Sequence, residues 1–373
     1  MKKQLVHIIT SLKMGGAESL LCDFLAFADH DTYEFAVIYF HEGPNVDRLR
    51  ALNIPLFHIK GAFCVYDPIF FWRLYRCIKS LRPSLVHTWL WSANIAGRII
   101  GTLLGVPVIN SFHNNVDQDG TFRGLLDCYS QWMATELVAV SDGVAASLVE
   151  HHNVAPAAIT TIKNGIAADA IKERGQHSAK NRASLGLSEM HFVIGSVGRF
   201  VALKNYGLLI EAFALLAQEV DDARLILVGS GPEEQHLRDL AVSLGITDTV
   251  IFVIGQQSYG YYPLFDCFAL SSYKEGISMA LLEAMSFGLP CVSTHEKTTH
   301  DVIKQGVNGL LVPSGNKIAL KEALKTVINE RENAVLWGEN AYKTVKIDLS
   351  LETMKKEYEN IYLKNIKYYD KNY

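Results

Sequence analysis

The chain has 373 residues, of which 49% are hydrophobic and 20% are charged, and its formal net charge is -4. This length suits two domains of about 150 to 200 residues better than one core. The weakly acidic balance argues against general nucleic-acid binding. The six cysteines are scattered without metal-ligand spacing, which predicts reduced thiols in a cytoplasmic protein.

The N-terminal segment and the longest apolar stretch bear on membrane insertion. Residues 1–10 combine a basic start with a short apolar run, which predicts a first β-strand rather than a signal peptide. The stretch 95–109 contains Arg98 and Pro107 and is too short to span a bilayer. We therefore expect a soluble protein, or one that lies peripherally on the inner face of the plasma membrane.

Short β-branched runs alternate with helical patterns along the chain, which predicts parallel sheets wrapped by helices. In the first half the expected strands are 4–10, 34–40, 84–88, 106–111 and 136–141. The expected helices are 17–29, 67–81, 93–104 and 142–152.

The same pattern restarts in the second half, after a polar segment, 167–190, that we interpret as the linker. The expected strands there are 192–198, 223–229, 250–253, 267–271, 291–294 and 309–312, with a helix over 206–216. We assign residues 1–170 to an N-terminal domain and residues 185–349 to a C-terminal domain, each a doubly wound α/β unit. Ligands of such sheets bind beyond the carboxyl ends of the strands.

The most informative segment is SSYKEGISMALLEAMSFGLP, residues 271–290, which contains Glu275 and Glu283. Glu283 is the only charge in an apolar helical pattern, where a carboxylate must be paired or hydrogen-bonded. The start of this helix offers free N–H groups and the Ser278 hydroxyl to an anion. Carboxylates can bind the hydroxyls of a sugar, and backbone amides can bind phosphate. Together these groups indicate a nucleotide-sugar ligand. A core helix with one satisfied glutamate explains these residues equally well.

Arg199 and Lys204 follow the expected strand 192–198 and precede a helix. The planar fork of arginine and the compact charge of lysine both suit a diphosphate. Solvated loop cations are the alternative. The nearby motif Gly229-Ser230-Gly231 imitates a dinucleotide fingerprint but lacks the third glycine.

Two strand ends of the first half carry candidate ligand contacts. Gly15 and Gly16 precede an amphipathic helix and let a ligand approach the backbone, although a tight turn with Glu18 as a helix-dipole acid is as good an explanation. His113 follows strand 106–111 and could hydrogen-bond a hydroxyl, although a lone histidine is more often structural. We interpret His87 as structural.

Two Asp-x-Asp triplets, at residues 29–31 and 117–119, resemble a metal clamp. Triplets of this kind arise by chance in a chain of this composition. We interpret both as structural and expect no metal site.

Together these motifs resemble the retaining glycosyltransferases of family four, which have the GT-B fold of two facing Rossmann-like domains with an interdomain cleft. The resemblance covers most of the chain. It runs from GGAE (15–18) through Gly198-Arg199, Lys204 and LVGSGPEE (227–234) to Glu275-x7-Glu283 and GVNGLLVPSG (306–315). It implies a hexosyltransferase that needs no metal or other cofactor. Its donor would be a nucleotide-sugar, with a UDP-sugar favoured, and its acceptor a saccharide or lipid-linked saccharide in cell-surface polysaccharide biosynthesis.

The resemblance also implies roles for the charged residues. Arg199 and Lys204 would neutralise the departing diphosphate, Glu275 would contact hydroxyls of the transferred sugar, and Glu283 would contact the ribose. His113 would meet the donor sugar from the N-terminal domain. The family is thought to retain configuration by front-side attack assisted by the leaving phosphate, so we assign no general base.

The remaining donor contacts implied by the resemblance come from backbone and small side chains. They are Gly15, Gly16, Gly276, Ile277 and Ser278. Many relatives read Glu-Gly-Phe-Gly where this chain has Glu275-Gly276-Ile277-Ser278, a departure that bears on sugar selectivity. The usual glycine after the lysine is replaced by Asn205.

The segment 67–82 mixes aromatic residues with arginine and lysine. A basic amphipathic helix can lie on an anionic membrane, but a core-packing helix with a solvated basic face is the alternative that we favour. The C-terminal residues, about 350–373, are expected to form a helix that packs back on the N-terminal domain.

Two other functions stay open: a GT-B-like nucleotide-sugar epimerase, and a non-catalytic homologue in an assembly complex.

Overall fold

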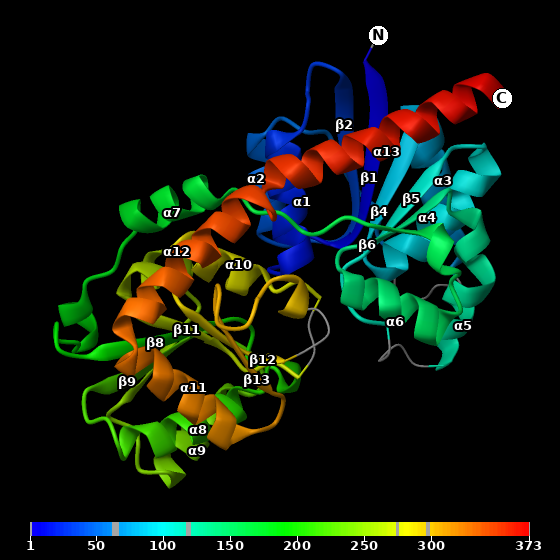
Figure 1. The fold of residues 1–373 in the computed structure, drawn as a ribbon. Coiled ribbons are helices and arrows are strands. Elements are labelled where there is room, and N and C mark those ends of the chain that lie inside the picture. The colour runs from blue at the N-terminus through cyan, green and yellow to red at the C-terminus, as the bar shows by residue number, and fades with distance from the viewer. Residues whose placement is uncertain (1, 62–66, 117–120, 274–275, 296–298, 373) are drawn as a thin grey trace. The chain divides into compact units, whose positions relative to one another are not determined.

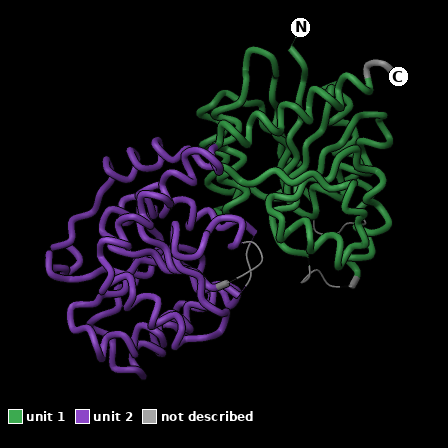
Figure 2. Tube along the Cα trace, viewed as in Figure 1, with its two compact units in different colours: residues 1–165, 351–373 green, residues 166–350 purple. Residues whose placement is uncertain are grey.

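The computed structural model describes residues 2–61, 67–116, 121–273, 276–295 and 299–372. The chain divides into two compact units (Figure 2). Unit 1 comprises residues 1–165 and 351–373, and unit 2 comprises residues 166–350. Each unit is a parallel sheet with interspersed helices (Figure 1), which confirms the two predicted Rossmann-like sheets.

The sheet of unit 1 has the strand order β3-β2-β1-β4-β5-β6-β7. The chain changes direction across this sheet between β1 and β4, as in a doubly wound fold. Strands buried on both faces read as nearly continuous apolar runs, which is why most of them could be predicted. The strands are β1 (Lys3–Ser11), β2 (Tyr33–His41), β3 (Leu56–His58), β4 (Leu85–Trp89), β5 (Val108–Phe112), β6 (Glu136–Ala139) and β7 (Ile159–Thr161).

The helices of unit 1 form two layers. α1 packs with the C-terminal helix α13, whereas α3, α4 and α5 contact one another in sequence. The tyrosines Tyr358 and Tyr362 of α13 are fully buried in this unit. The helices are α1 (Gly16–Phe27), α2 (Asn45–Ala51), α3 (Pro68–Leu81), α4 (Trp91–Leu104), α5 (Thr121–Ser130), α6 (Asp142–His152) and α13 (Leu351–Asn372), with the 3-10 turns η1 (Gln131–Met133) and η2 (Pro156–Ala158).

The sheet of unit 2 has the order β10-β9-β8-β11-β12-β13 and separates two cores. Val193 of β8 faces the first core and Ile194 the second, as the period of two in a strand requires. The strands are β8 (Phe192–Val197), β9 (Ala223–Gly229), β10 (Val250–Ile254), β11 (Cys267–Leu270), β12 (Cys291–His295) and β13 (Leu310–Pro313). The helices are α7 (Ala168–His177), α8 (Tyr206–Ala217), α9 (Glu234–Ser243), α10 (Met279–Ser286), α11 (Lys317–Asn329) and α12 (Arg331–Ile347), with η3 (Arg182–Leu185), η4 (Ala202–Lys204), η5 (Tyr259–Leu264) and η6 (Thr299–Asp301).

The structure differs from the expected elements at short strands and at the linker. The three-residue strands β3 and β7 were not predicted. The polar segment interpreted as a linker contains α7, which belongs to unit 2. Its Gly175 lies so close to the Phe287 ring that an added Cβ would overlap it. Three buried positions in an otherwise polar helix are too weak a signal to reveal this packing.

The described cysteines are all free thiols: Cys22, Cys77, Cys128, Cys267 and Cys291. Among the described residues, no helix has the length and apolar character that a bilayer crossing requires.

Candidate functional site

The predicted cations lie on the loop that follows β8 in unit 2. Phe200, between β8 and η4, is fully buried and anchors this loop. Its N–H donates to the Ser230 carbonyl (2.9 Å), and its carbonyl accepts from the Glu233 N–H (3.0 Å). The neighbouring Arg199 side chain is exposed and makes no hydrogen bond or ion pair with any residue the structure describes. The backbone thus fixes where the Arg199 side chain begins, and its exposed guanidinium is available to a ligand.

Glycines let this loop lie close against the end of β9. A Cβ added at Gly229 would overlap the Gly198 carbonyl, and one added at Gly231 would overlap the Phe200 carbonyl. Gly198 itself has a φ of 155°, in the region that favours glycine. The Gly229-Ser230-Gly231 motif therefore seats the loop after β8, a role that needs no third glycine.

The loop with Lys204 is tied to the loop that follows β11. The Ser271 hydroxyl donates to the carbonyls of Lys204 (3.1 Å) and Asn205 (2.9 Å). The Tyr273 N–H donates to the Leu203 carbonyl (2.9 Å). Asn205 adopts the left-handed conformation (φ 48°, ψ 44°), which asparagine tolerates better than most residues, so it can stand where the family resemblance implies a glycine. The carboxyl ends of β8 and β11 are thereby joined into one surface.

The start of α10 adjoins the loop after β11. Ser278 is its N-cap residue, yet its hydroxyl makes no capping bond. That hydroxyl is buried and has no hydrogen-bond partner within the described ranges. The first N–H groups of a helix also lack intrahelical acceptors and favour an anion. This helix start can therefore bind an anion or a polar ligand.

The other predicted residues around α10 differ in how they can contribute. Gly276 is buried, and the Ile277 side chain packs in the core of unit 2, so a side-chain contact there with a ligand is unfavourable. Glu275 lies outside the described residues. Its predicted role therefore stays a prediction.

Glu283, on α10, is oriented by a core tyrosine that sequence reasoning missed. The Tyr262 hydroxyl donates to a Glu283 carboxylate oxygen at 2.6 Å. Tyr262 stacks on Phe287, with ring centroids 5.2 Å apart. Burial, and secondarily the Glu283 carboxylate, raise the pKa of Tyr262, so its hydroxyl remains a donor. Nothing in the pattern of residues 259–264 signals this contact.

In unit 1, Gly15 and Gly16 lie between β1 and the first turn of α1. Glu18 folds over Gly15, and its carboxylate fills the space that a Cβ would occupy. The same carboxylate accepts from the Ser11 hydroxyl at 2.7 Å. The nearest atoms belong to the flexible end of the Glu18 side chain, which can move aside, so this packing alone does not require glycine at position 15. A ligand contact at Gly15 and Gly16 stays a prediction.

His113 follows β5 and stacks on Trp89 (centroids 4.9 Å apart). Burial lowers the pKa of His113 to about 3, and in the described structure neither ring nitrogen has a hydrogen-bond partner. Unpaired buried polar atoms are rare, so this ring is a candidate ligand contact. His87 is different, because its two nitrogens bond the hydroxyls of Tyr362 (2.7 Å) and Ser111 (2.8 Å). His87 therefore has the structural role that we assigned to it.

Within the described residues, no cluster of three or more histidine, cysteine, aspartate or glutamate side chains could hold a metal ion. In the first Asp-x-Asp triplet, the Asp29 carboxylate caps a turn by accepting from the N–H groups of Asp31 and Thr32. The second triplet, 117–119, lies outside the described residues.

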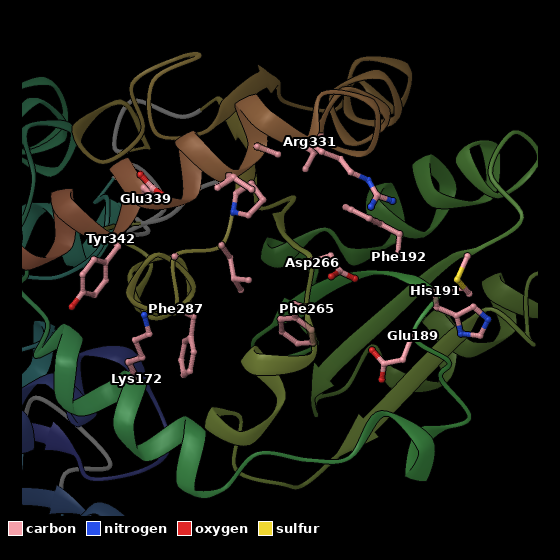
Figure 3. A pocket seen from close by; sticks show the side chains of 17 residues that line it. Lys172, Glu189, His191, Phe192, Phe265, Asp266, Phe287, Arg331, Glu339 and Tyr342 are labelled. Carbon is pink, nitrogen blue, oxygen red and sulfur yellow. The ribbon is translucent and has the colours of Figure 1, made fainter.

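A cavity of about 560 Å³ lies in unit 2, away from these loops (Figure 3). Its lining includes Phe192, Asp266 and Pro290, which stand at the amino ends of β8, β11 and β12. Arg199 and Ser278 stand at the carboxyl ends. Asp266 is already paired, with Arg182 at 2.8 Å. This cavity is therefore distinct from the predicted donor site.

Comparisons with known proteins cover both units. A family model described as glycosyl transferases group 1 matches residues 177–344, and one described as Glycosyltransferase Family 4 matches residues 14–170. A putative glycosyltransferase EpsF of Bacillus subtilis is 26% identical over 309 residues, which is 78% of this chain and 79% of that protein.

A further relative is the UDP-Gal:alpha-D-GlcNAc-diphosphoundecaprenol alpha-1,3-galactosyltransferase of Escherichia coli. It is 22% identical over 353 residues, which is 88% of this chain and 89% of the relative. Among solved structures, Anabaena Alr3699/HepE in complex with UDP matches with a TM-score of 0.85 at 20% identity, over 97% of this chain and 99% of HepE. At that identity the match shows a shared fold.

Proposed function

This chain belongs to the group 1 glycosyltransferases of GT-B fold, and we propose that it transfers a hexose from a UDP-sugar to a saccharide or lipid-linked saccharide in cell-surface polysaccharide biosynthesis. Two comparisons support this donor and acceptor. HepE was solved with UDP and with UDP-glucose. The Escherichia coli relative is named for UDP-Gal and a diphosphoundecaprenol-linked acceptor.

The observation that carries the proposal is the joined surface at the carboxyl ends of β8 and β11. It contains the exposed Arg199 guanidinium, the half-buried Lys204 and the buried Ser278 hydroxyl, which has no hydrogen-bond partner among the residues that the structure describes. Cleavage of the bond between the sugar and the nucleotide leaves negative charge on the diphosphate. Fixed cations and helix-terminal N–H groups stabilise that charge as it develops, which lowers the barrier.

The other residues bind and orient the donor in this proposal. Glu283, held by Tyr262, accepts hydrogen bonds from the ribose hydroxyls. His113 is uncharged near neutral pH and can hydrogen-bond a sugar hydroxyl. Glu275 contacts the transferred sugar, and Gly16 brings backbone amides to the phosphates. The leaving phosphate assists front-side attack by the acceptor. The anomeric configuration is therefore retained, and neither a protein base nor a metal is needed.

The donor is tested by thermal shift with UDP, GDP and ADP. A nucleotide at a hundred times its dissociation constant adds about 2.7 kcal/mol to the free energy of unfolding. Stabilisation by UDP alone is expected, and stabilisation by GDP or ADP instead would refute the proposed base. Transfer is then followed with EDTA present, and the anomeric configuration of the product is read by NMR.

The site is tested by removing one cation at a time. Lys204→Ala is expected to lower kcat by roughly 10²- to 10³-fold. Lys343→Ala removes an exposed cation of α12 and serves as the matched control that keeps full activity. Full transfer by Lys204→Ala would contradict the site assignment. Conversion of the donor sugar without any acceptor would instead favour the epimerase.

A further inference from the structure

One side of unit 1 combines exposed aromatic residues with an excess of positive charge. α3, α4 and α5 lie next to one another on this side (Figure 1), and η1 continues α5 against α4. We call the outward surface of these four elements the α3–α5 face. We propose that the α3–α5 face docks unit 1 on a bilayer that contains anionic lipids.

The first observation is the outward stripe of α3. The helix buries Phe70, Leu74 and Ile78, so its opposite side faces solvent. The exposed stripe holds Ile69, Trp72, Arg73, Arg76 and Lys79, spaced as one face of a helix.

This stripe mixes apolar and cationic side chains at contact distance. The Arg76 guanidinium lies over the Trp72 ring, 4.9 Å from its centroid. Ile69 and Trp72 are each more than half exposed. A core-packing helix explains the buried side of α3 but not these large apolar residues on its outer side.

The second observation is a separate apolar stripe on α5 and η1. Phe122, Leu125, Tyr129 and Trp132 recur at helical spacing and are 48% to 77% exposed. The opposite side of α5 carries Asp127, which is buried in an ion pair with Arg98 (2.6 Å). The stripe therefore points away from the core. Tryptophan and tyrosine are the residues enriched where proteins meet the bilayer interface.

The third observation is the sign of the charge. On α3, α4, α5 and η1, the described residues include one carboxylate, Asp127, and it is buried. The exposed cations Arg73, Arg76 and Lys79 therefore face no carboxylate of these elements, and Arg82 adds a further cation at the end of α3. The whole chain, by contrast, has a net charge of -4. A positive patch on a negative protein is complementary to an anionic surface.

Apolar side chains that can enter the headgroup region, together with cations that attract it, are what interfacial binding requires. A protein partner with an acidic groove would use the cations but would have to cover two separate aromatic stripes. The proposal deepens the proposed function through its lipid-linked acceptor, and it can be tested without catalysis.

The test is co-sedimentation of the full chain with vesicles of phosphatidylcholine, alone or mixed with phosphatidylglycerol. We expect binding to the mixed vesicles, weaker binding to phosphatidylcholine alone, and a loss of binding as salt rises. Each cation near an anionic surface contributes about 1 kcal/mol, which is roughly fivefold in partition. The triple variant R73Q/R76Q/K79Q should therefore bind roughly a hundredfold more weakly.

Matched variants separate binding through the α3–α5 face from non-specific electrostatic attraction of the whole chain to the vesicles. K180Q/K304Q/K343Q removes three exposed cations of unit 2 and should bind vesicles like the unaltered chain. Trp72→Ser with Trp132→Ser should weaken binding without changing its salt dependence. A cooperative urea-unfolding transition shows whether each variant is folded. Thermal stabilisation by UDP then tests the donor separately from the membrane.

Three results would overturn the proposal. They are absence of binding to the mixed vesicles, equal loss in the two triple variants, and unchanged binding in the tryptophan variant. Self-association that disappears in the tryptophan variant, without vesicle binding, would assign the face to a second copy of the chain.

Discussion

Lowering the pH from about 7.5 to about 5.5 is expected to destabilise unit 1, because its core contains histidines that bind protons only on unfolding. His7, His87 and His113 lie on the neighbouring strands β1 and β4 and directly after β5. Burial lowers the pKa of His7 and of His113 to about 3. Burial also lowers the pKa of His87 well below its usual range.

The sign and size of the effect follow from these shifts. An unfolded histidine has a pKa of about 6.5. Stability is therefore complete above that value and is lost as the pH falls from about 6.5 towards 3. Each histidine contributes a loss of about 1.4 kcal/mol per pH unit in this window. At about pH 5.5 the three together should lower the free energy of unfolding by about 4 kcal/mol, a large part of the roughly 5 to 15 kcal/mol that is usual.

The pH window avoids the carboxylates that act in the opposite direction. Burial raises the pKa of Glu357 and of Glu359 on α13, so unit 1 gains some stability when they take up protons. Their ordinary pKa is near 4.5, and above about pH 5.5 this gain is small compared with the histidine effect.

The measurement is urea unfolding at about pH 7.5, 6.5 and 5.5, followed by tryptophan fluorescence. The signal reports mainly on unit 1, because Trp72, Trp89, Trp91 and Trp132 belong to it and Trp337 alone belongs to unit 2. His7→Phe should remove about one third of the pH dependence, roughly 1.4 kcal/mol, even if it destabilises the protein at pH 7.5.

The matched control alters a histidine outside unit 1. His177→Gln changes an exposed histidine of unit 2 and should leave the pH dependence unchanged. A loss below about 1 kcal/mol between the two pH values, or identical slopes for His7→Phe and the unaltered chain, would show that the buried histidines are not the cause.

Three further outcomes test the site and the core. Gly229→Ala should displace the loop after β8 and abolish thermal stabilisation by UDP. Gly207→Ala in α8 is the control: its added Cβ would lie 3.7 Å from the nearest atom, on Leu240, and should raise the free energy of unfolding by up to about 1 kcal/mol. Tyr262→Phe removes a charge-assisted hydrogen bond to Glu283, so the free energy of unfolding measured in urea should fall by about 1.5 to 3 kcal/mol. Donor affinity should fall as well, and unchanged affinity would mean that Tyr262 does not orient Glu283 for the donor. Asp127→Ala leaves a buried guanidinium on α4 without its carboxylate and should cost about 3 to 5 kcal/mol in the same assay.

The sequence alone determined the architecture and the positions of the candidate site residues along the chain. Apolar runs of strand length alternate with helical patterns, and in parallel sheets the loops after the strands meet at one edge. That is why Arg199, Lys204 and Ser278 could be expected at one edge of one sheet from local pattern, while their role in binding a donor stays a prediction. The prediction for Glu275 rests on the family resemblance, since it lies outside the described residues.

Only the tertiary structure decided which partners hold these residues. Tyr262 lies 21 positions from Glu283, and Tyr362 lies 275 positions from His87. Contacts at such separations follow from packing and leave no periodic trace in the sequence. The α3–α5 face is decided in the same way, because it depends on which sides of separate helices the core leaves uncovered. Local patterns specify the elements and the ends of the strands, whereas the packing of distant segments decides which side chains are oriented, buried or exposed.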